Sequence, residues 1–302
     1  MMHMPSHIYV QVGMWDRAIE QNEKAMRSDA EYRRRSPDQL IQHGYMAHNA
    51  HMRAFASMMA GREKEAMASA RAMWENFPPE VLEMVAAFVD PTMCSVYDVQ
   101  KRFGRWEDLL SEPAPPAYLP ITTAMWHAHR AVAYAALKDF DNAEAEQRAF
   151  RESVRAIPPE PGFASYGDVI KILLVSEYFV SAEIALQQDE LEVAASLLEQ
   201  AADIEDTIGY MEPPLWLQPV RHTLGAVYLK AGDYEQAARV YREDLENWPR
   251  NGWSLLGLSQ ALEGAGDTAL ARATRREFEA VWANADDPAG SSCRCIAEIA
   301  IP

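Results

Sequence analysis

A pattern of small residues recurs at a fixed interval near the C-terminal end of the chain, and it limits the possible folds more than any other feature. Within the stretch that begins at Leu224, Gly232 and Ala237 are followed 34 positions later by Gly266 and Ala271. This interval is typical of a unit of two antiparallel helices, whose small residues let the helix axes approach closely. One unit cannot bury its own apolar face, so units must stack in series. The repeat therefore predicts an array of helix pairs.

The same arrangement of small and aromatic residues recurs upstream at less regular intervals. It is centred on Gly13, Gly61, Gly104, Tyr134 and Ala194. We therefore expect an all-α solenoid, a right-handed superhelix of about six or seven antiparallel helix pairs. The first helix of each pair should line the concave face.

The array is expected to span residues 1–283 as one continuous domain. Residues 284–302 are rich in helix breakers and are predicted to form a C-terminal tail. Proline-rich stretches near 112–120 and 157–167 are predicted to be irregular connections, because proline lacks the helical donor and clashes with the preceding turn. The chain starts in an amphipathic pattern with no cap before it, so we expect an N-terminally truncated part of a longer array.

Composition excludes several classes of protein. The 302 residues are 49% hydrophobic and 24% charged, an ordinary globular composition. The formal net charge of −17 disfavours binding to nucleic acid, whose phosphates the average surface would repel. No apolar run is long enough to span a membrane, and three cysteines cannot form a disulfide framework. No export signal is visible, which favours the cytoplasm, and the oligomeric state stays open.

The segment from Leu224 to Ala271 resembles the tetratricopeptide repeat family at nearly every defining position, and the resemblance extends over most of the chain. A narrower likeness lies in the run HMPSHIY at residues 3–9 and in residues 48–51. These segments are similar to those of uncharacterised bacterial tetratricopeptide proteins. The resemblance implies recognition of a peptide or protein segment in the concave groove, and it carries over no catalytic residue.

Counting positions along each repeat predicts which side chains face this groove. In tetratricopeptide arrays, positions 2, 5, 9 and 12 of the first helix point into it. The side chains that fall on these positions are His3, His7, His48, His51, His222, Trp253 and Gln260. Trp253 is expected to offer an aromatic platform to a bound peptide.

The four N-terminal histidines of this set allow two interpretations. His3 and His7 are i,i+4 neighbours, and His48 and His51 are i,i+3 neighbours, so each pair lies on one helical face. Neutral imidazoles at these spacings could bind a divalent zinc, iron or copper ion. Alternatively, they are groove-lining residues that form hydrogen bonds with a peptide carboxylate or with neighbouring helices.

The cysteines are expected to carry no chemistry. Cys293 and Cys295 are separated by one residue, whereas redox and zinc motifs have two residues between the cysteines. Cys94 is expected to pack as a small apolar residue.

We therefore predict a scaffold that binds a peptide or protein segment in its concave groove, and the acidic surface favours a basic partner. The alternative is a histidine-ligated metal site that supports chemistry on a small substrate. Catalytic activity is the less favoured of the two, and the sequence identifies no catalytic residue.

Overall fold

The fold is built from consecutive α-helices. The computed structural model describes residues 2–37, 39–157 and 166–296. These residues contain no strand, one 3-10 turn at Asp90–Thr92 and fifteen α-helices: α1 (Met4–Gln11), α2 (Trp15–Arg35), α3 (Leu40–Met59), α4 (Glu63–Glu75), α5 (Pro79–Val89), α6 (Ser95–Phe103), α7 (Trp106–Ser111), α8 (Pro120–Ala136), α9 (Phe140–Ala156), α10 (Tyr166–Gln187), α11 (Leu191–Glu205), α12 (Val220–Ala231), α13 (Tyr234–Asn247), α14 (Gly252–Gly264) and α15 (Thr268–Val281).

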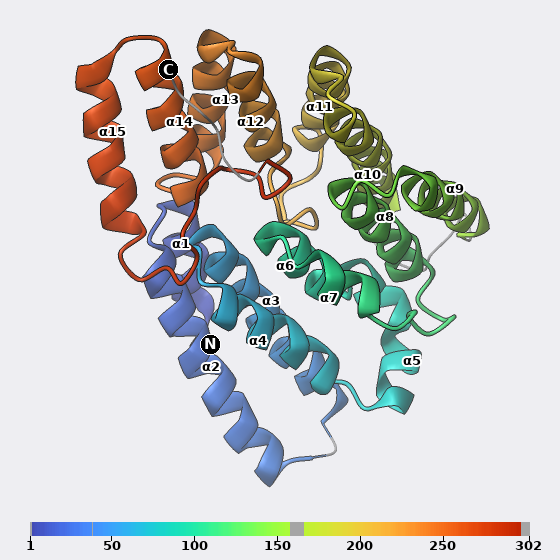
Figure 1. Cartoon of the computed structure of the whole chain (residues 1–302). Helices are drawn as coiled ribbons and strands as arrows, with labels where there is room; N and C mark the ends of the chain where they lie inside the picture. Colours follow the sequence, from blue (N-terminus) through green and yellow to red (C-terminus); the bar gives the residue numbers. More distant parts are fainter. Residues whose placement is uncertain (1, 38, 158–165, 297–302) are drawn as a thin grey trace.

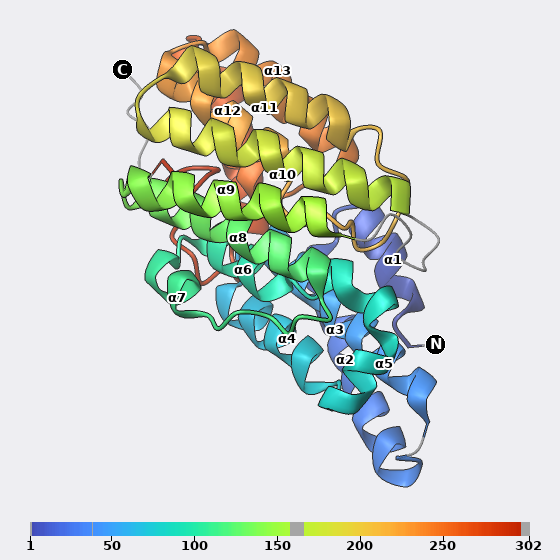
Figure 2. The ribbon, with the colours of Figure 1, turned by 90° about the vertical axis from the view of Figure 1, so that its right-hand side faces the viewer.

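Neighbouring helices pack as antiparallel pairs in chain order. The pairs are α1/α2, α3/α4, α6/α7, α8/α9, α10/α11, α12/α13 and α14/α15, with α5 inserted after the second. Figure 2 shows the helices from α8 to α11 lying side by side along one face. The expectation of an all-α solenoid of helix pairs is therefore confirmed. Residues 112–119 connect α7 to α8, whereas 158–165 of the second expected connection lie outside the described residues.

Each pair turns through one residue with positive φ. Five of the seven turns use glycine, at Gly13, Gly61, Gly104, Gly232 and Gly266, where φ lies between +68° and +84°. Glycine adopts this left-handed conformation without the steric penalty that a Cβ atom brings. The recurring glycines of the sequence therefore mark the turns within pairs.

Small residues also set the distance between helices. A Cβ atom on Gly225 would lie 2.4 Å from the Tyr241 ring, and one on Gly257 would lie 2.1 Å from it. Tyr241 is fully buried between α12 and α14. The ring fills the space that the two glycines leave, as the repeat pattern requires.

The array bends until its two ends meet, so that the pairs form a closed ring (Figure 1). A Cβ atom on Gly13 would lie 2.1 Å from the backbone oxygen of Pro249. Further along the same contact, the Phe55 and Trp248 ring centroids are 5.1 Å apart, and the Trp253 indole donates to the backbone oxygen of Met58 at 2.8 Å. The first two pairs therefore pack against the last two.

Residues 285–296, here called the C-terminal segment, leave α15 and enter the interior of this ring (Figure 1). The Arg102 guanidinium of α6 donates to the backbone oxygen of Ser292, and Gln187 of α10 donates to that of Cys295 at 2.8 Å. The Ser292 hydroxyl donates to the backbone oxygen of His222 in α12 at 2.8 Å. The described part of the expected tail is thus fixed inside the fold, and residues 297–302 lie outside the described residues.

No described helix combines the length and the apolar character that crossing a membrane requires.

Candidate functional site

Three of the predicted histidines come together at the start of the chain. His3 caps α1, His7 lies one turn further along it, and His48 reaches them from α3. Their ring centroids are 5.2–5.5 Å apart, and one ring nitrogen of each lies within 4.8 Å of the others. All three side chains are partly exposed. We call these three residues the histidine cluster.

The Glu212 carboxylate orients the ring of His7. The Nδ1 atom of His7 lies 2.5 Å from the Glu212 carboxylate, which also accepts a hydrogen bond from Gln11. When Nδ1–H of His7 donates to Glu212, its Nε2 carries the free lone pair. A carboxylate behind a histidine is the arrangement that fixes the tautomer of metal-binding imidazoles.

Burial and neighbouring imidazoles lower the pKa of two members of the cluster, His3 and His48. Burial, followed by the charges of His3 and His7, lowers the pKa of His48 to about 4. The pKa of His3 is lowered in the same direction, first by burial and then by His7. Neutral imidazole is the form in which histidine offers a lone pair.

The fourth predicted ligand, His51, lies apart from this cluster. It is buried in the interior of the ring, where burial and then His48 lower its pKa to about 3. The i,i+3 spacing placed His48 and His51 on one face of α3, but only the ring nitrogens of His48 lie close to those of His3 and His7.

The remaining predicted groove residues are covered by the chain itself. His222 and Trp253 are 0% exposed. The His222 ring accepts from Arg102 at 3.0 Å and donates to Asp244 at 3.0 Å, while the Arg102 guanidinium lies 3.7 Å from the centre of the Trp253 ring. The expectation that Trp253 offers a platform to a peptide is thereby corrected.

Gln260 is also engaged within the chain, since its amide donates to the backbone oxygen of Gly290 at 3.3 Å. The counting scheme located side chains on the inner wall, but the C-terminal segment and the closed ring fill the space in front of them. His222, Trp253 and Gln260 are therefore engaged by other residues of the chain, whereas His3, His7 and His48 stay partly exposed.

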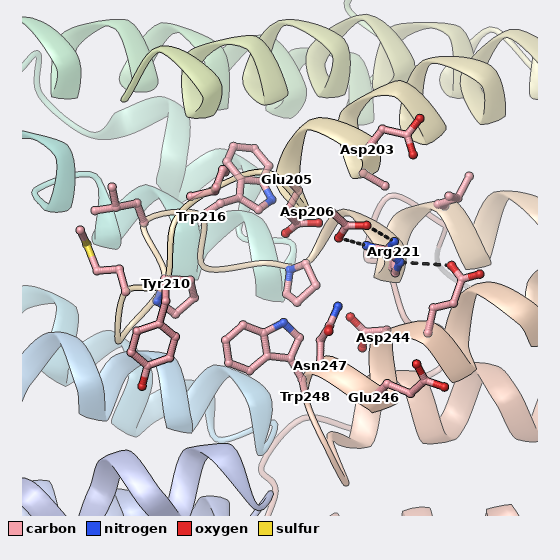
Figure 3. A pocket seen from close by; sticks show the side chains of 18 of the residues that line it. Asp203, Glu205, Asp206, Tyr210, Trp216, Arg221, Asp244, Glu246, Asn247 and Trp248 are labelled. Carbon is pink, nitrogen blue, oxygen red and sulfur yellow. Dashed lines mark hydrogen bonds and ion pairs between the residues drawn. The ribbon is translucent and has the colours of Figure 1, made fainter. Parts of the chain in front are cut away.

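A hollow of about 1040 Å³ opens beside the histidine cluster, between α11, α12, α13 and the loop of residues 206–219 (Figure 3). Gln11, which binds Glu212, lines one side of it. Gln11 and Glu212 therefore connect one side of the hollow to His7, although none of the three histidines lines it. Sequence counting missed this hollow because residues 206–219 have no place in the repeat.

Acidic groups dominate the lining. Among the described residues, seven carboxyl groups and two guanidinium groups line the hollow: Glu199, Asp203, Glu205, Asp206, Glu243, Asp244 and Glu246, with Arg221 and Arg239. Arg221 forms ion pairs with Asp206 at 2.7 Å and with Glu243 at 3.4 Å. No ion pair forms at Asp203 or Glu246 with any described residue. Figure 3 shows both at the rim of the hollow.

The other end of the hollow is aromatic. Trp216, Trp248 and Tyr210 line it, and Tyr210 is 80% exposed (Figure 3). Burial raises the pKa of the Glu205 carboxyl to about 8, even though it accepts from the backbone nitrogen of Val220. The hollow thus joins an apolar wall to a set of exposed carboxylates.

Comparison with known families identifies the repeat unit. The tetratricopeptide repeat model matches residues 222–252, which cover most of α12, all of α13 and the chain as far as the first residue of α14. The chain contains a tetratricopeptide repeat. The match, with the packing of helices in adjacent pairs, identifies the fold as a tetratricopeptide-type solenoid and supports the role of a protein-interaction scaffold. A comparison with the curated proteins found no match.

Proposed function

We propose that this tetratricopeptide solenoid binds a basic segment of a partner protein in the hollow between α11, α12, α13 and residues 206–219. The observation that carries the proposal is the hollow itself, a large open concavity that the C-terminal segment does not fill. Its volume suits several side chains of an extended or helical segment.

The lining supports a particular kind of segment. Asp203 and Glu246 are exposed carboxylates without an ion pair among the described residues, so a lysine or arginine of the partner would meet an unpaired charge. At the other end, Tyr210 and Trp248 present aromatic surface that suits an apolar anchor. An apolar anchor beside one or two basic residues therefore matches the hollow, and complementary charge adds selectivity and association rate.

The test is binding to an array of short synthetic peptides that combine an apolar residue with lysine or arginine, compared with the same peptides carrying aspartate or glutamate. We expect the basic peptides to bind and their affinity to fall as salt is raised. The double variant Asp203→Lys/Glu246→Lys should weaken binding by about tenfold, which corresponds to about 1.4 kcal/mol.

The double variant Glu80→Lys/Glu83→Lys is the matched control, because it makes the same change of charge on α5, outside the hollow. Equal binding by the two double variants would contradict the proposed site. Equal binding of basic and acidic peptides would contradict the proposed partner.

A second candidate function, metal-dependent chemistry on a small substrate, is favoured by the histidine cluster. Three tetrahedral nitrogen ligands of zinc, with bonds of about 2.1 Å, lie about 3.4 Å from one another. The three ring nitrogens, all within 4.8 Å, need only small side-chain movements to reach that geometry. The three imidazoles are partly exposed, so a small substrate could approach such an ion from solvent.

Metal analysis of protein purified without a polyhistidine tag tests this candidate. The variant His7→Ala/His48→Ala should lose about one equivalent of zinc, iron or copper relative to the unmodified chain. The control His127→Ala removes a histidine that pairs with Glu146 away from the cluster, and it should lose none. An unchanged metal content in the double variant would exclude the cluster as a binding site.

A further inference from the structure

The C-terminal segment brings two thiols to a buried carboxylate in the interior of the ring. Cys293 and Cys295 approach Glu183, which projects inward from α10. The Cys295 sulfur lies 2.8 Å from Oε1 of Glu183, and the Cys293 sulfur lies 4.0 Å from the same oxygen. The three ligand atoms all lie within 4.8 Å of one another. We call these three residues the thiol cluster.

A tight turn places both sulfurs on the same side of the segment. The backbone nitrogen of Cys295 donates to the Cys293 sulfur at 3.3 Å, and that of Ile296 donates to the Cys293 oxygen at 3.2 Å. The chain therefore reverses within four residues. This turn explains how a spacing of one residue, unlike the spacing of common zinc motifs, still gives two convergent ligands.

The carboxylate of this cluster is incompletely satisfied by the protein. Glu183 is 1% exposed, and its Oε2 atom is buried without a hydrogen-bond partner. Burying a carboxylate oxygen without a partner is costly, and such groups are normally paired or bound to a metal. The other oxygen of the same carboxylate, Oε1, contacts the Cys295 sulfur, and thiolate sulfur is a ligand for a thiophilic cation.

The surrounding charges fit a divalent ion. Lys101 of α6 is 3% exposed, its ammonium lies 4.3 Å from the centre of the Trp216 ring, and it interacts electrostatically with Cys295 and Glu183. Two thiolates and one carboxylate carry three negative charges. A divalent cation would offset two of these charges, and the buried Lys101 and Arg102 side chains, which both interact electrostatically with Cys295, supply further positive charge.

We propose that Glu183, Cys293 and Cys295 bind a zinc ion that fastens the C-terminal segment to α10. Sulfur and carboxylate oxygen together suit a borderline-soft ion, whereas magnesium and calcium prefer oxygen alone and copper(I) prefers sulfur. With bonds of about 2.3 Å to sulfur and about 2.1 Å to oxygen, tetrahedral ligand atoms lie about 3.5–3.8 Å apart. This separation falls within the range that the three atoms span.

The experiment uses the full chain, without a polyhistidine tag and under reducing conditions, in the His7→Ala/His48→Ala background so that the two clusters are separated. Zinc is measured after gel filtration, and cobalt is added to metal-free protein to record sulfur-to-cobalt charge-transfer absorption. We expect about one equivalent of zinc and the cobalt absorption.

Adding Cys295→Ser or Glu183→Gln should reduce zinc to less than a tenth of an equivalent and abolish the cobalt absorption. Cys295 is partly exposed, so its replacement leaves the packing largely intact, and circular dichroism verifies the fold. Cys94→Ser is the matched control, because it replaces a buried thiol that contacts Asp98 instead, and it should retain both signals.

Three results would overturn the proposal. The first is folded, reduced protein with three free thiols that takes up neither zinc nor cobalt. The second is zinc that stays bound after Cys295→Ser. The third is a disulfide between Cys293 and Cys295 that persists under the reducing conditions.

Discussion

Closure of the ring predicts a large effect of adding one methyl group at Gly13. In Gly13→Ala the new Cβ atom would lie 2.1 Å from the Pro249 oxygen and 2.7 Å from its carbonyl carbon. These are backbone atoms, so no side-chain rotation relieves the clash. The contact between the first helix pair and the turn before α14 must therefore shift.

The cost has two parts. Gly13 has φ of +68°, and an alanine in this left-handed region costs about 1–2 kcal/mol. Overpacking against a fixed neighbour adds about 1–3 kcal/mol, for a total of about 2–5 kcal/mol. Gly232→Ala isolates the first part, because Gly232 has φ of +76° and a Cβ atom there would meet nothing within 4 Å.

The assay is urea unfolding followed by circular dichroism, with midpoints compared at equal slope. Gly13→Ala should lose more stability than Gly232→Ala by about 1–3 kcal/mol. Small-angle X-ray scattering should show a larger radius for Gly13→Ala alone, because its ends separate. Equal losses in the two variants, with equal radii, would refute a closed ring in solution.

Three further outcomes are expected. Burial raises the pKa of Glu205 to about 8, so the folded state keeps a proton that the unfolded chain releases above its ordinary pKa of 4.5. The free energy of unfolding should therefore fall as pH rises between these two values. Thermal unfolding at pH 5 and pH 8 measures this fall, and Glu205→Gln should remove most of it. Ser292→Ala leaves the buried Tyr241 hydroxyl without its partner at 2.6 Å and should cost about 1–2 kcal/mol in urea unfolding, whereas a loss near zero would contradict a fixed C-terminal segment. Asp267 accepts from the Leu270 nitrogen at the start of α15, and Asp267→Ala should cost about 1 kcal/mol by the same measurement, with no change in slope.

The sequence predicted helix pairs well where glycine occupies the turn. The two pairs whose turns lack glycine, α8/α9 and α10/α11, have Lys138 and Asp189 at the positive-φ position, with φ of +63° and +65°. Other residues can adopt this conformation at a cost that the surrounding packing must offset. A search for glycine at a fixed spacing therefore underestimates such pairs.

The period of the sequence repeat could not predict that the array closes into a ring or that its interior is filled. A repeat period describes contacts between neighbouring units, whereas Gly13 meets Pro249 from the opposite end of the array. His3, His7 and His48, which counting assigned to related positions, lie close together, but counting could not show that Trp253 would be covered. Whether the inner wall is covered depends on where residues 285–296 lie after the last helix.

The place of the C-terminal segment also affects how the chain reaches its fold during synthesis. All seven helix pairs leave the ribosome before residues 285–296 do, so Arg102 and the backbone oxygen of His222 first face an interior without their partner Ser292. A nascent chain that pauses at this stage has polar groups hydrated where the finished protein excludes water. The interior of the ring is therefore completed late in folding, when residues 285–296 pack into it. A chaperone that recognises the unfilled ring would bind before that step.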